Sequence, residues 1–510
     1  MKYAIAAGHP GTAQAAEQIL LAGGNAVDAA IAAAFASWVA EPLMTSAGGG
    51  GFAAVHLPSG KNFFLDFFVQ TPRKKRPREE VLIRPLEVNF GDTTETFYVG
   101  PGTTAVPGFI DGLFTLHQRY GRMSMRDLVA PACQLAAEGV KLNPFQIYCI
   151  GLLDEMLRED ENSLRLFYRD SRILREEDPL YMSRICSFLD ALAREGRDFF
   201  YLGEPAQKLV QLQRETGGQI ELEDLASYRS IVRRPLFLKH RGFHIYTFPP
   251  PNNGGSLLGL LLHRMNELPP PPPQSHSAEH ALWLLRCLNG IAELKHHPEQ
   301  LLHALRANSL WGNTTHFSIL DREGMAISLT SSNGEGSGTF LPGTDIQLNN
   351  MMGEPALLPK GLHTWAPDSR LTSMMTPTLV AHASPLESKS EPKTSPPTAL
   401  HSALGSAGAG RIPFAIAQVL HFMLDYPGPL DKAVNAARTY FHQGIFELEP
   451  GFDHLPEERL PPTMELRIWT RKSLYFGGVN AVGRQKDGSY MAAADQRREG
   501  VSLCSSEAGA

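Results

Sequence analysis

Hydroxyl and imidazole side chains are concentrated in the segment 313–321, which reads Asn-Thr-Thr-His-Phe-Ser-Ile-Leu-Asp. The hydroxyl of Thr314 could attack a carbonyl carbon, but a threonine is a weak nucleophile unless a base beside it removes its proton. Threonine is also common in ordinary β-strands. On residue types alone, an ordinary strand is therefore the simpler interpretation of this segment.

A β-hairpin must position these residues. Polar and apolar residues alternate after Thr314, the polar sequence 322–324 ends in glycine, and a second alternating run follows through Ser332. Two period-2 runs around a short polar loop are typical of antiparallel strands joined by a turn. The pattern predicts that Thr314 begins the first strand and that Ser332 ends the second.

The residues before this hairpin predict a mixed region of helices and strands. The glycines at 23–24 separate two helical patterns, because glycine reaches the left-handed conformation that ends a helix. The expected elements are helices at about 13–22 and 26–39, a strand at 52–57, helices across much of 110–230, and a strand at 243–248.

Composition argues against several kinds of partner. The chain has 510 residues and a net charge of -6, so we expect neither nucleic acid nor an acidic membrane as a partner. The one dense basic run, 73–76, contains no aromatic residue and is interpreted as a solvated loop. The apolar stretch 29–40 is too short to span a bilayer. No secretory signal is visible, so we expect a soluble cytoplasmic protein.

Cysteine usage and low-complexity stretches complete this survey. The five cysteines are odd in number and lack metal-ligand spacing, which predicts neither a disulfide framework nor a structural zinc site. The proline run 269–273 favours a polyproline II linker, and 384–397 is rich in Ser, Pro, Lys and Glu. Both stretches are expected to be disordered or linker segments.

Other catalytic patterns are weaker in this chain. No Gly-x-Ser-x-Gly elbow occurs, and a Ser-x-x-Lys match at 390–393 lies in a low-complexity stretch. His296 and His297 are adjacent, so they cannot share a metal on one helix face. No lysine follows the glycine-rich segment 405–410, which excludes a P-loop. We expect no metal and no other cofactor.

Ten segments, in order, resemble the γ-glutamyltransferase (γ-glutamyltranspeptidase) family. Single glycine-rich or proline-rich pieces are weak signals, but the set includes the Thr-x-His-x-Ser hairpin and spans nearly the whole chain. The segments are 24–30, 41–42, 48–52, 105–108, 199–203, 223–228, 249–255, 314–318, 348–352 and 371–378.

This resemblance implies a precursor that cuts its own Asn313–Thr314 bond, giving a large fragment 1–313 and a small fragment 314–510 that associate as a heterodimer. The freed α-amine of Thr314, with a reference pKa of about 7.7–8.0, would be the base for the hydroxyl of the same residue. The implied fold is α+β, a four-layer αββα sandwich of the N-terminal-nucleophile (Ntn) hydrolase type. The implied activity is that of a γ-glutamyltransferase or glutathione hydrolase, with water, an amino acid or a peptide as acceptor.

Further roles follow from the resemblance by position. Ser332 falls where the family has a threonine that hydrogen-bonds the nucleophile. Gly408 and Ala409 fall where two adjacent glycines supply the backbone N–H groups of an oxyanion hole. Taken singly, each residue that resembles a ligand of the donor's α-amino or α-carboxylate group could equally be an ordinary polar loop residue. These residues are Asn333, Asn350, Glu354, Thr372 and Ser373.

Two departures from the family pattern, at Phe68 and Met351, bear on the acyl donor, and a third, at Ala409, lies in the oxyanion loop. Phe68 stands where the family has an arginine that grips the donor carboxylate, and phenylalanine cannot make those bonds. Arg370 could replace that arginine or could be a surface residue. Met351 stands where a polar ligand is often found, and Ala409 replaces a glycine. The remaining alternatives are an Ntn amidase acting on another acyl group and an unprocessed, inactive homologue.

Overall fold

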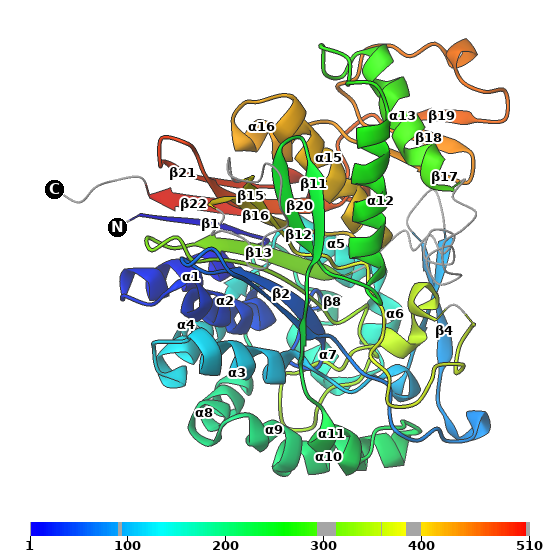
Figure 1. The fold of residues 1–510 in the computed structure, drawn as a ribbon. Helices are drawn as coiled ribbons and strands as arrows, with labels where there is room; N and C mark the ends of the chain where they lie inside the picture. The colour runs from blue at the N-terminus through cyan, green and yellow to red at the C-terminus, as the bar shows by residue number, and fades with distance from the viewer. Residues whose placement is uncertain (1, 90–93, 293–312, 359, 384–398, 506–510) are drawn as a thin grey trace.

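Two antiparallel sheets form the centre of the structure, a computed structural model that describes residues 2–89, 94–292, 313–358, 360–383 and 399–505 (Figure 1). From edge to edge in the described part of the chain, the first sheet contains β10 (Ile231–Arg233), β3 (Asn62–Phe67), β2 (Gly50–His56), β14 (Ala326–Ser332), β13 (Thr314–Leu320), β1 (Tyr3–Ala7) and β22 (Val501–Ser505). The second contains β11 (Leu236–His240), β12 (Phe243–Thr247), β15 (Thr378–His382), β16 (Leu400–Ala407), β20 (Gly478–Arg484) and β21 (Tyr490–Ala494). β13 therefore lies inside its sheet, paired on both sides.

The two sheets face each other through hydroxyl side chains of the hairpin. Ser318 on β13 donates a hydrogen bond to the carbonyl oxygen of Asn480 on β20, and Ser328 on β14 donates to that of Leu404 on β16. Figure 1 shows helices on the outer side of each sheet. They are α1 (Pro10–Leu21) and α2 (Ala26–Ala40) beside the first sheet, and α15 (Ile412–Asp425) and α16 (Leu430–Val434) beside the second.

Helix α2 is buried along its whole length because its alanine side chains let α1, α4 (Met125–Glu138) and the first sheet approach closely. The side chain of Asn25 accepts hydrogen bonds from two N–H groups of the first turn, and the Asp28 carboxylate accepts one from the Asn25 N–H. This capping box fixes where the helix begins. At the other end of α2, the carboxylate of Glu41 contacts the start of β13 at Thr315.

The remaining elements surround this centre. The other helices before the hairpin are α3 (Phe109–Tyr120), α5 (Pro144–Leu152), α6 (Asp154–Leu157), α7 (Glu161–Phe167), α8 (Ile185–Glu195), α9 (Arg197–Leu202), α10 (Glu204–Thr216), α11 (Leu222–Ser227), α12 (Asn253–Glu267) and α13 (Ala278–Ala292). Short strands are β4 (Arg84–Asn89), β5 (Thr94–Val99), β6 (Val140–Lys141), β7 (Tyr168–Arg169), β8 (Arg172–Ile173), β9 (Pro179–Leu180), β17 (Thr439–His442), β18 (Ile445–Leu448) and β19 (Glu465–Ile468).

Residues on the two sides of the Asn313–Thr314 bond build both sheets together. β1 pairs with β13 and β22, β2 pairs with β14, and β12 pairs with β15. These pairings are held by hydrogen bonds and side-chain packing. Breaking the one peptide bond at 313–314 would therefore leave the pairings in place.

Most of the expected elements are confirmed, including the hairpin, the first two helices, and the helices across 110–230. The mixed α and β content is also confirmed. The run 269–273 is a linker between α12 and α13, as predicted, but it is packed against the protein and is not disordered. The carbonyl oxygens of Pro269 and Pro272 accept hydrogen bonds from Trp283 and Tyr426, which tie the run to two helices. The predicted low-complexity loop 384–397 lies outside the described residues.

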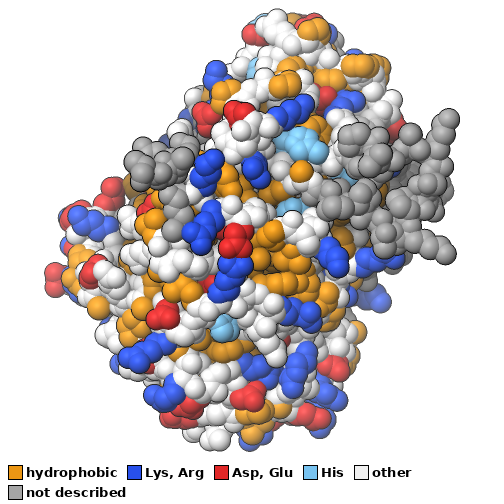
Figure 2. All heavy atoms as spheres, turned by 60° about the vertical axis from the view of Figure 1, so that its left-hand side comes forward, with side chains coloured by type: hydrophobic (Ala, Val, Ile, Leu, Met, Phe, Trp, Pro, Cys, Tyr) orange, Lys and Arg blue, Asp and Glu red, His pale blue; other side chains and the backbone are white. Residues whose placement is uncertain are grey.

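Charges of both signs are interspersed on the face of the molecule shown in Figure 2. The basic run 73–76 is a loop whose first three residues are exposed, as predicted. Among the described residues, the helices are too short or too polar to cross a lipid bilayer.

Candidate active site

The hairpin register brings Ser332 to the peptide bond that the sequence predicts to be cut. Thr314 pairs with Ser332 across β13 and β14. The Ser332 hydroxyl donates a hydrogen bond to the carbonyl oxygen of Asn313 at 2.5 Å and accepts one from the N–H of Gly334 at 3.0 Å. A donor on this oxygen stabilises the negative charge that develops when the carbonyl carbon is attacked. The contact therefore favours attack at the Asn313–Thr314 bond.

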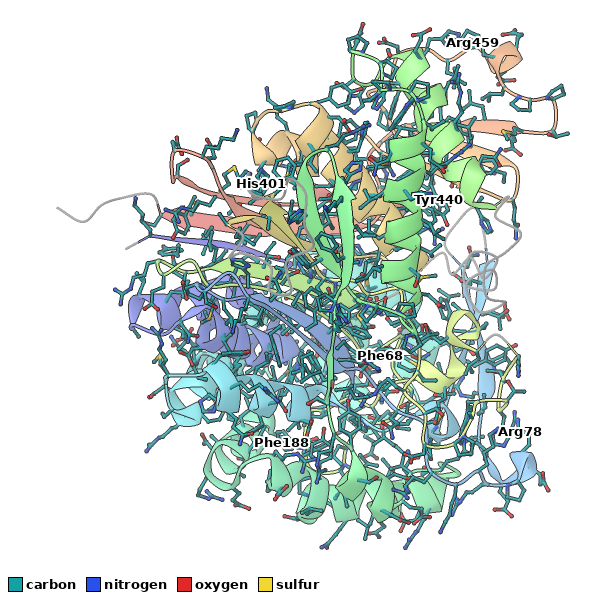
Figure 3. All side chains as sticks on the ribbon, viewed as in Figure 1. Phe68, Arg78, Phe188, His401, Tyr440 and Arg459 are labelled. Atoms are coloured by element: carbon teal, nitrogen blue, oxygen red, sulfur yellow. The ribbon has the colours of Figure 1, made fainter. Side chains whose placement is uncertain are left out.

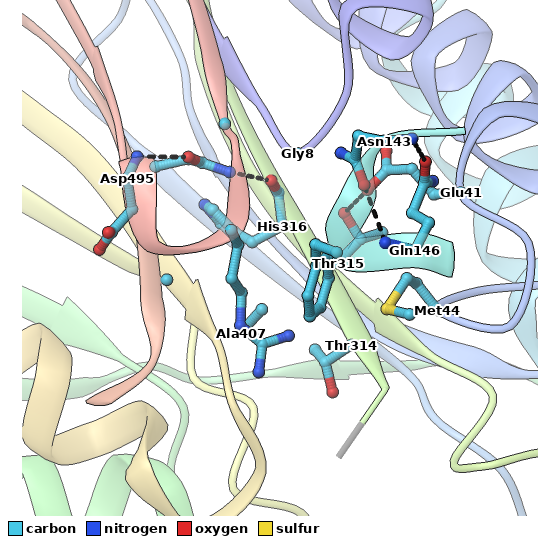
Figure 4. Close-up of a pocket in the computed structure, with 15 residues that line it drawn as sticks. Gly8, Glu41, Met44, Asn143, Gln146, Thr314, Thr315, His316, Ala407 and Asp495 are labelled. Carbon is cyan, nitrogen blue, oxygen red and sulfur yellow. Dashed lines mark hydrogen bonds between the residues drawn. The ribbon is translucent and has the colours of Figure 1, made fainter. Parts of the chain in front are cut away.

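Thr314 lines a small buried cavity of about 20 Å³ (Figure 4). Ala407 and Arg498 line the same cavity, and both Asn313 and Thr314 are buried. A cavity of this size holds roughly one water molecule. The part of this cavity formed by the described residues therefore has room for about one water beside the threonine.

Thr315 anchors the start of β13 on its opposite face. Its hydroxyl donates a hydrogen bond to Glu41, and Thr12 donates to the other carboxylate oxygen at 2.6 Å. A side chain at Gly8 would collide with Glu41, so a glycine is needed there. Burial raises the pKa of Glu41, while the two hydroxyl donors oppose that shift. These contacts hold the end of α2 against the nucleophile strand.

His316 is held between the sheets and is not positioned as a base. Its two ring nitrogens lie 2.8 Å from the hydroxyl of Thr330 and 2.9 Å from that of Ser318. A Cβ on Gly405 would collide with the ring, so the second sheet leaves just enough space for the imidazole. Burial lowers the pKa of His316 to about 3, which keeps it neutral. The base for Thr314 must come from another group.

The glycine-rich turn predicted to form the oxyanion hole follows the cavity-lining Ala407. Gly408 has φ +123° and Ala409 has φ +47°, and a Cβ on Gly408 would lie 2.8 Å from the Cα of Gly477. A left-handed alanine costs roughly 1–2 kcal/mol. The turn is therefore beside the cavity and strained, and the assignment of its N–H groups to an oxyanion stays a prediction.

Three of the predicted donor-binding residues come together beside Ser332. Asn350 accepts a hydrogen bond from the Glu335 N–H at 2.8 Å. A Cβ on Gly334 would collide with both Asn350 and Glu354, so these two side chains meet at that glycine. Asn333 is buried next to it in sequence, and its amide donates to the carbonyl oxygens of residues 347 and 348 at 3.4 Å.

The other two predicted ligands bond to their own surroundings. The Thr372 hydroxyl donates to the carbonyl oxygen of Pro251 at 2.8 Å. The Ser373 hydroxyl accepts from the N–H of Met375 at 3.1 Å. The described contacts do not connect either hydroxyl with Asn350 or Glu354, so their role toward a donor carboxylate stays a prediction.

Glu335 is a buried residue near the scissile bond that sequence reasoning missed. It is 1% exposed, and its carboxylate accepts a hydrogen bond from the N–H of Asn313. Burial raises its pKa well above the ordinary value, with Glu354 and Glu95 adding to the shift. Burial also raises the pKa of Glu354 to about 8, with help from Glu95. No sequence motif marks Glu335, because its position depends on the turn after Ser332.

Phe68 is a core residue. It is 1% exposed and stacks on Phe52 with ring centroids 5.4 Å apart, inside an apolar cluster that also contains Met351 and Met374. Figure 3 shows Phe68 in the interior of the molecule. The position at which the family pattern has an arginine therefore presents only apolar surface here.

The structure does not support Arg370 as a substitute for that arginine. Its guanidinium donates to the carbonyl oxygens of Phe68 and Arg229 and to the hydroxyl of Tyr228. It also lies over the Tyr228 ring at 4.6 Å and 3.8 Å from the carboxylate of Asp66. These contacts engage both terminal nitrogens and hold the end of β3 in place, while the Nε has no hydrogen-bond partner among the described residues.

Comparisons with known proteins agree with the ordered motifs. Among curated relatives, Acylase ACY 1 proenzyme of Pseudomonas sp. (strain SE83) is 26% identical, over 98% of this chain and 92% of that protein. Glutathione hydrolase proenzyme of Escherichia coli (strain K12) is also 26% identical, over 95% of this chain and 88% of that protein. A crystal structure of cephalosporin acylase from Bacillus halodurans has the same fold, with a TM-score of 0.78 at 22% identity over 98% of this chain and 95% of that one.

The sequence profile of one family, described as Gamma-glutamyltranspeptidase, matches residues 12–285 and 279–505. These ranges include all ten segments on which the resemblance rests, and they contain the hairpin with Thr314 and Ser332. The match covers both predicted fragments, and the mixed fold agrees with it. The chain belongs to the gamma-glutamyltranspeptidase family.

Proposed function

We propose that this protein is a self-processing amidohydrolase or acyltransferase whose nucleophile is the amino-terminal Thr314 of the fragment 314–510. The observation that carries the proposal is the Ser332 hydroxyl bonded to the Asn313 carbonyl oxygen, directly across the hairpin from Thr314. The names of both curated relatives contain the word proenzyme, which also supports processing. The facing sheets with outer helices support the αββα sandwich of Ntn hydrolases.

Maturation proceeds by an acyl shift. The Thr314 hydroxyl oxygen attacks the Asn313 carbonyl carbon, and Ser332 stabilises the charge on the carbonyl oxygen. The C–N bond then breaks, the nitrogen takes up the proton that the hydroxyl has lost and becomes the new α-amine, and an ester joins Asn313 to the threonine oxygen. Water hydrolyses this ester, which leaves a carboxylate on Asn313 and a free hydroxyl on Thr314.

Turnover uses the same oxygen with a base of its own. The α-amine takes the hydroxyl proton, the oxygen attacks a substrate amide, and the amine half of the substrate leaves with a proton. The acyl group, now an ester on Thr314, passes to water or to an amine acceptor. His316 is neutral and bonded to two hydroxyl groups, so it does not compete for this role.

The first candidate for the acyl group is γ-glutamyl. Asn350 and Glu354 meet beside Ser332, where carboxyl and amide oxygens suit the α-ammonium group of such a donor. On this candidate the protein is a γ-glutamyltransferase or glutathione hydrolase.

The second candidate is a different acyl group on the same nucleophile. Two observations favour it. The position at which the family has a carboxylate-binding arginine holds the buried, uncharged Phe68, and the guanidinium of Arg370 is engaged by other groups of the protein. The 26% identity to an acylase equals that to a glutathione hydrolase.

Mass spectrometry of the purified protein tests processing, and anilide assays test the acyl group. We expect two fragments divided between Asn313 and Thr314. Turnover of γ-glutamyl-4-nitroanilide by the processed protein favours the first candidate, and processing without that turnover favours the second. A single intact chain in an active preparation would refute the proposed function.

A further inference from the structure

Arg498 places a positive charge at the nucleophile. It is the last residue of the short 3₁₀ turn 496–498 and lines the same cavity as Thr314. Its stem packs on β20, where a Cβ on Gly478 would lie 2.6 Å from the Arg498 Cδ. Its Nη2 is 3.7 Å from the point that a Cβ on Gly408 would occupy. The guanidinium is thus beside both the threonine and the predicted oxyanion turn.

The donors of this guanidinium are largely unused. Arg498 is 7% exposed, and its Nε and Nη1 have no hydrogen-bond partner within the described ranges. Its guanidinium lies 5.2 Å from the centre of the Phe145 ring. The preceding Arg497, by contrast, bonds to the carboxylates of Glu449 and Asp495. Burying an unpaired charge opposes folding, so a purely structural role would be expected to use these donors.

The two carboxylates that line the cavity, those of Glu41 and Asp495, are already engaged by other groups. Glu41 accepts hydrogen bonds from two threonines, and Asp495 pairs with Arg438 and Arg497. Burial lowers the pKa of Arg498 to about 10, so the group is charged at neutral pH. Among the described residues that line the cavity, Arg498 is the one cationic side chain.

A guanidinium with free parallel donors binds carboxylates in bidentate geometry. The family position for such a group holds the buried Phe68, and Arg370 is engaged elsewhere. Cleavage frees Asn313 from Thr314, and the space that Asn313 fills beside Ser332 then becomes available to a substrate. A substrate carboxylate entering there would meet Arg498.

We propose that Arg498 binds a carboxylate of the substrate next to Thr314, so that the enzyme prefers amides carrying a carboxylate in the acyl part or in the amine part. This inference rests on the proposed function and narrows its substrate class. Phe145 provides an apolar surface beneath the guanidinium that excludes water from the ion pair.

The test uses the processed protein and three 4-nitroanilides. Glutaryl-4-nitroanilide carries a carboxylate in the acyl part, valeryl-4-nitroanilide carries none, and valeryl-3-carboxy-4-nitroanilide carries one in the amine part. Arg498→Met keeps the stem and removes the charge, Arg498→Lys keeps the charge, and Arg459→Gln is a matched control at an exposed arginine.

Wild type should hydrolyse one carboxylate-bearing substrate with a kcat/KM higher than that for the neutral one. In Arg498→Met we expect this kcat/KM to fall about 10-fold to 100-fold, mainly through KM, because a charged hydrogen bond is lost. Turnover of the neutral valeryl-4-nitroanilide should fall much less than turnover of that carboxylate-bearing substrate. Arg498→Lys should recover part of the loss, and Arg459→Gln should behave as wild type. A loss with glutaryl-4-nitroanilide would show that Arg498 binds a carboxylate in the acyl part. A loss with valeryl-3-carboxy-4-nitroanilide would show that it binds one in the amine part.

Equal losses on all three substrates, or no loss on any, would overturn the inference. Calorimetric titration with glutarate and with 5-amino-2-nitrobenzoate, the amine product of the third substrate, gives a readout that does not need turnover. Wild type should bind at least one of them several-fold more tightly than Arg498→Met does. If Arg498→Met does not fold, Arg498→Gln removes the charge in its place. An affinity equal to that of wild type, in whichever of these two variants is soluble and processed, refutes the inference. If the wild-type chain does not cleave itself, the result counts against the proposed function and not against this inference. A denaturing gel of the wild-type protein distinguishes the two cases.

Discussion

The hydroxyl of Ser332 lies 2.5 Å from the carbonyl oxygen of Asn313, directly across the hairpin from Thr314. A hydrogen-bond donor therefore already engages the oxygen on which charge develops if the threonine attacks its own peptide bond. The same hydroxyl is tied to the backbone by the N–H of Gly334. This geometry belongs to the uncut chain and connects the proposed self-cleavage with the proposed catalysis.

Replacing Thr314 by alanine should abolish both processing and turnover, because the attacking oxygen is lost. A denaturing gel and intact-mass spectrometry should show one uncut chain. Thr314→Ser keeps a hydroxyl and should process more slowly. Cleavage at the same bond in Thr314→Ala would refute the assignment of the nucleophile.

Replacing Ser332 by alanine should slow processing by about 100-fold or more, which is the effect of removing one oxyanion donor in other enzymes. The rate is measured as the disappearance of the uncut chain on a gel over time. Ser332→Thr, which keeps the hydroxyl, is the matched control. A wild-type rate in Ser332→Ala would mean that the bond to Asn313 does not assist the attack.

Glu354 should make the folded protein less stable as the pH rises. Its folded pKa is about 8 against an ordinary 4.5, so the folded state binds this proton more tightly than the unfolded state. The stabilising contribution is full below about pH 4.5 and is lost as the pH rises through about 8. Glu354→Gln in an uncut Thr314→Ala background should therefore flatten the change in Tm between pH 5 and pH 8.

The control for this titration is Glu458→Gln, which removes an exposed carboxyl and should leave the pH dependence of Tm as in the background. If Glu354→Gln has the same pH dependence as its background, Glu354 does not take up a proton on folding.

Introducing the family's arginine at Phe68 should damage the fold without improving donor binding. Phe68 is 1% exposed and stacked on Phe52, so Phe68→Arg buries an unpaired charge and should lower the free energy of unfolding by about 3–5 kcal/mol. Phe68→Leu should cost roughly 1–2 kcal/mol. Urea unfolding in the uncut background measures both, and a stable Phe68→Arg variant with higher γ-glutamyl turnover would contradict the core assignment.

The sequence predicted the elements that depend on neighbours along the chain. Alternation through 314–332 predicted the hairpin, and the alanine-rich pattern from residue 26 predicted a buried helix. The ordered motifs pointed to the family, because each of them is a local signal and their order excludes coincidence. Thr314 and Ser332 were both found in this way.

Only the tertiary structure decided which side chains from distant segments meet at Thr314. It brought Glu335 to Asn313 and Arg498 to the cavity, and it engaged Arg370 with Tyr228. Periodicity specifies the face on which a residue lies, but sheet order and helix packing determine what lies opposite that face. β13 lies inside one sheet and against another, so its neighbours come from across the chain, and no local pattern encodes them.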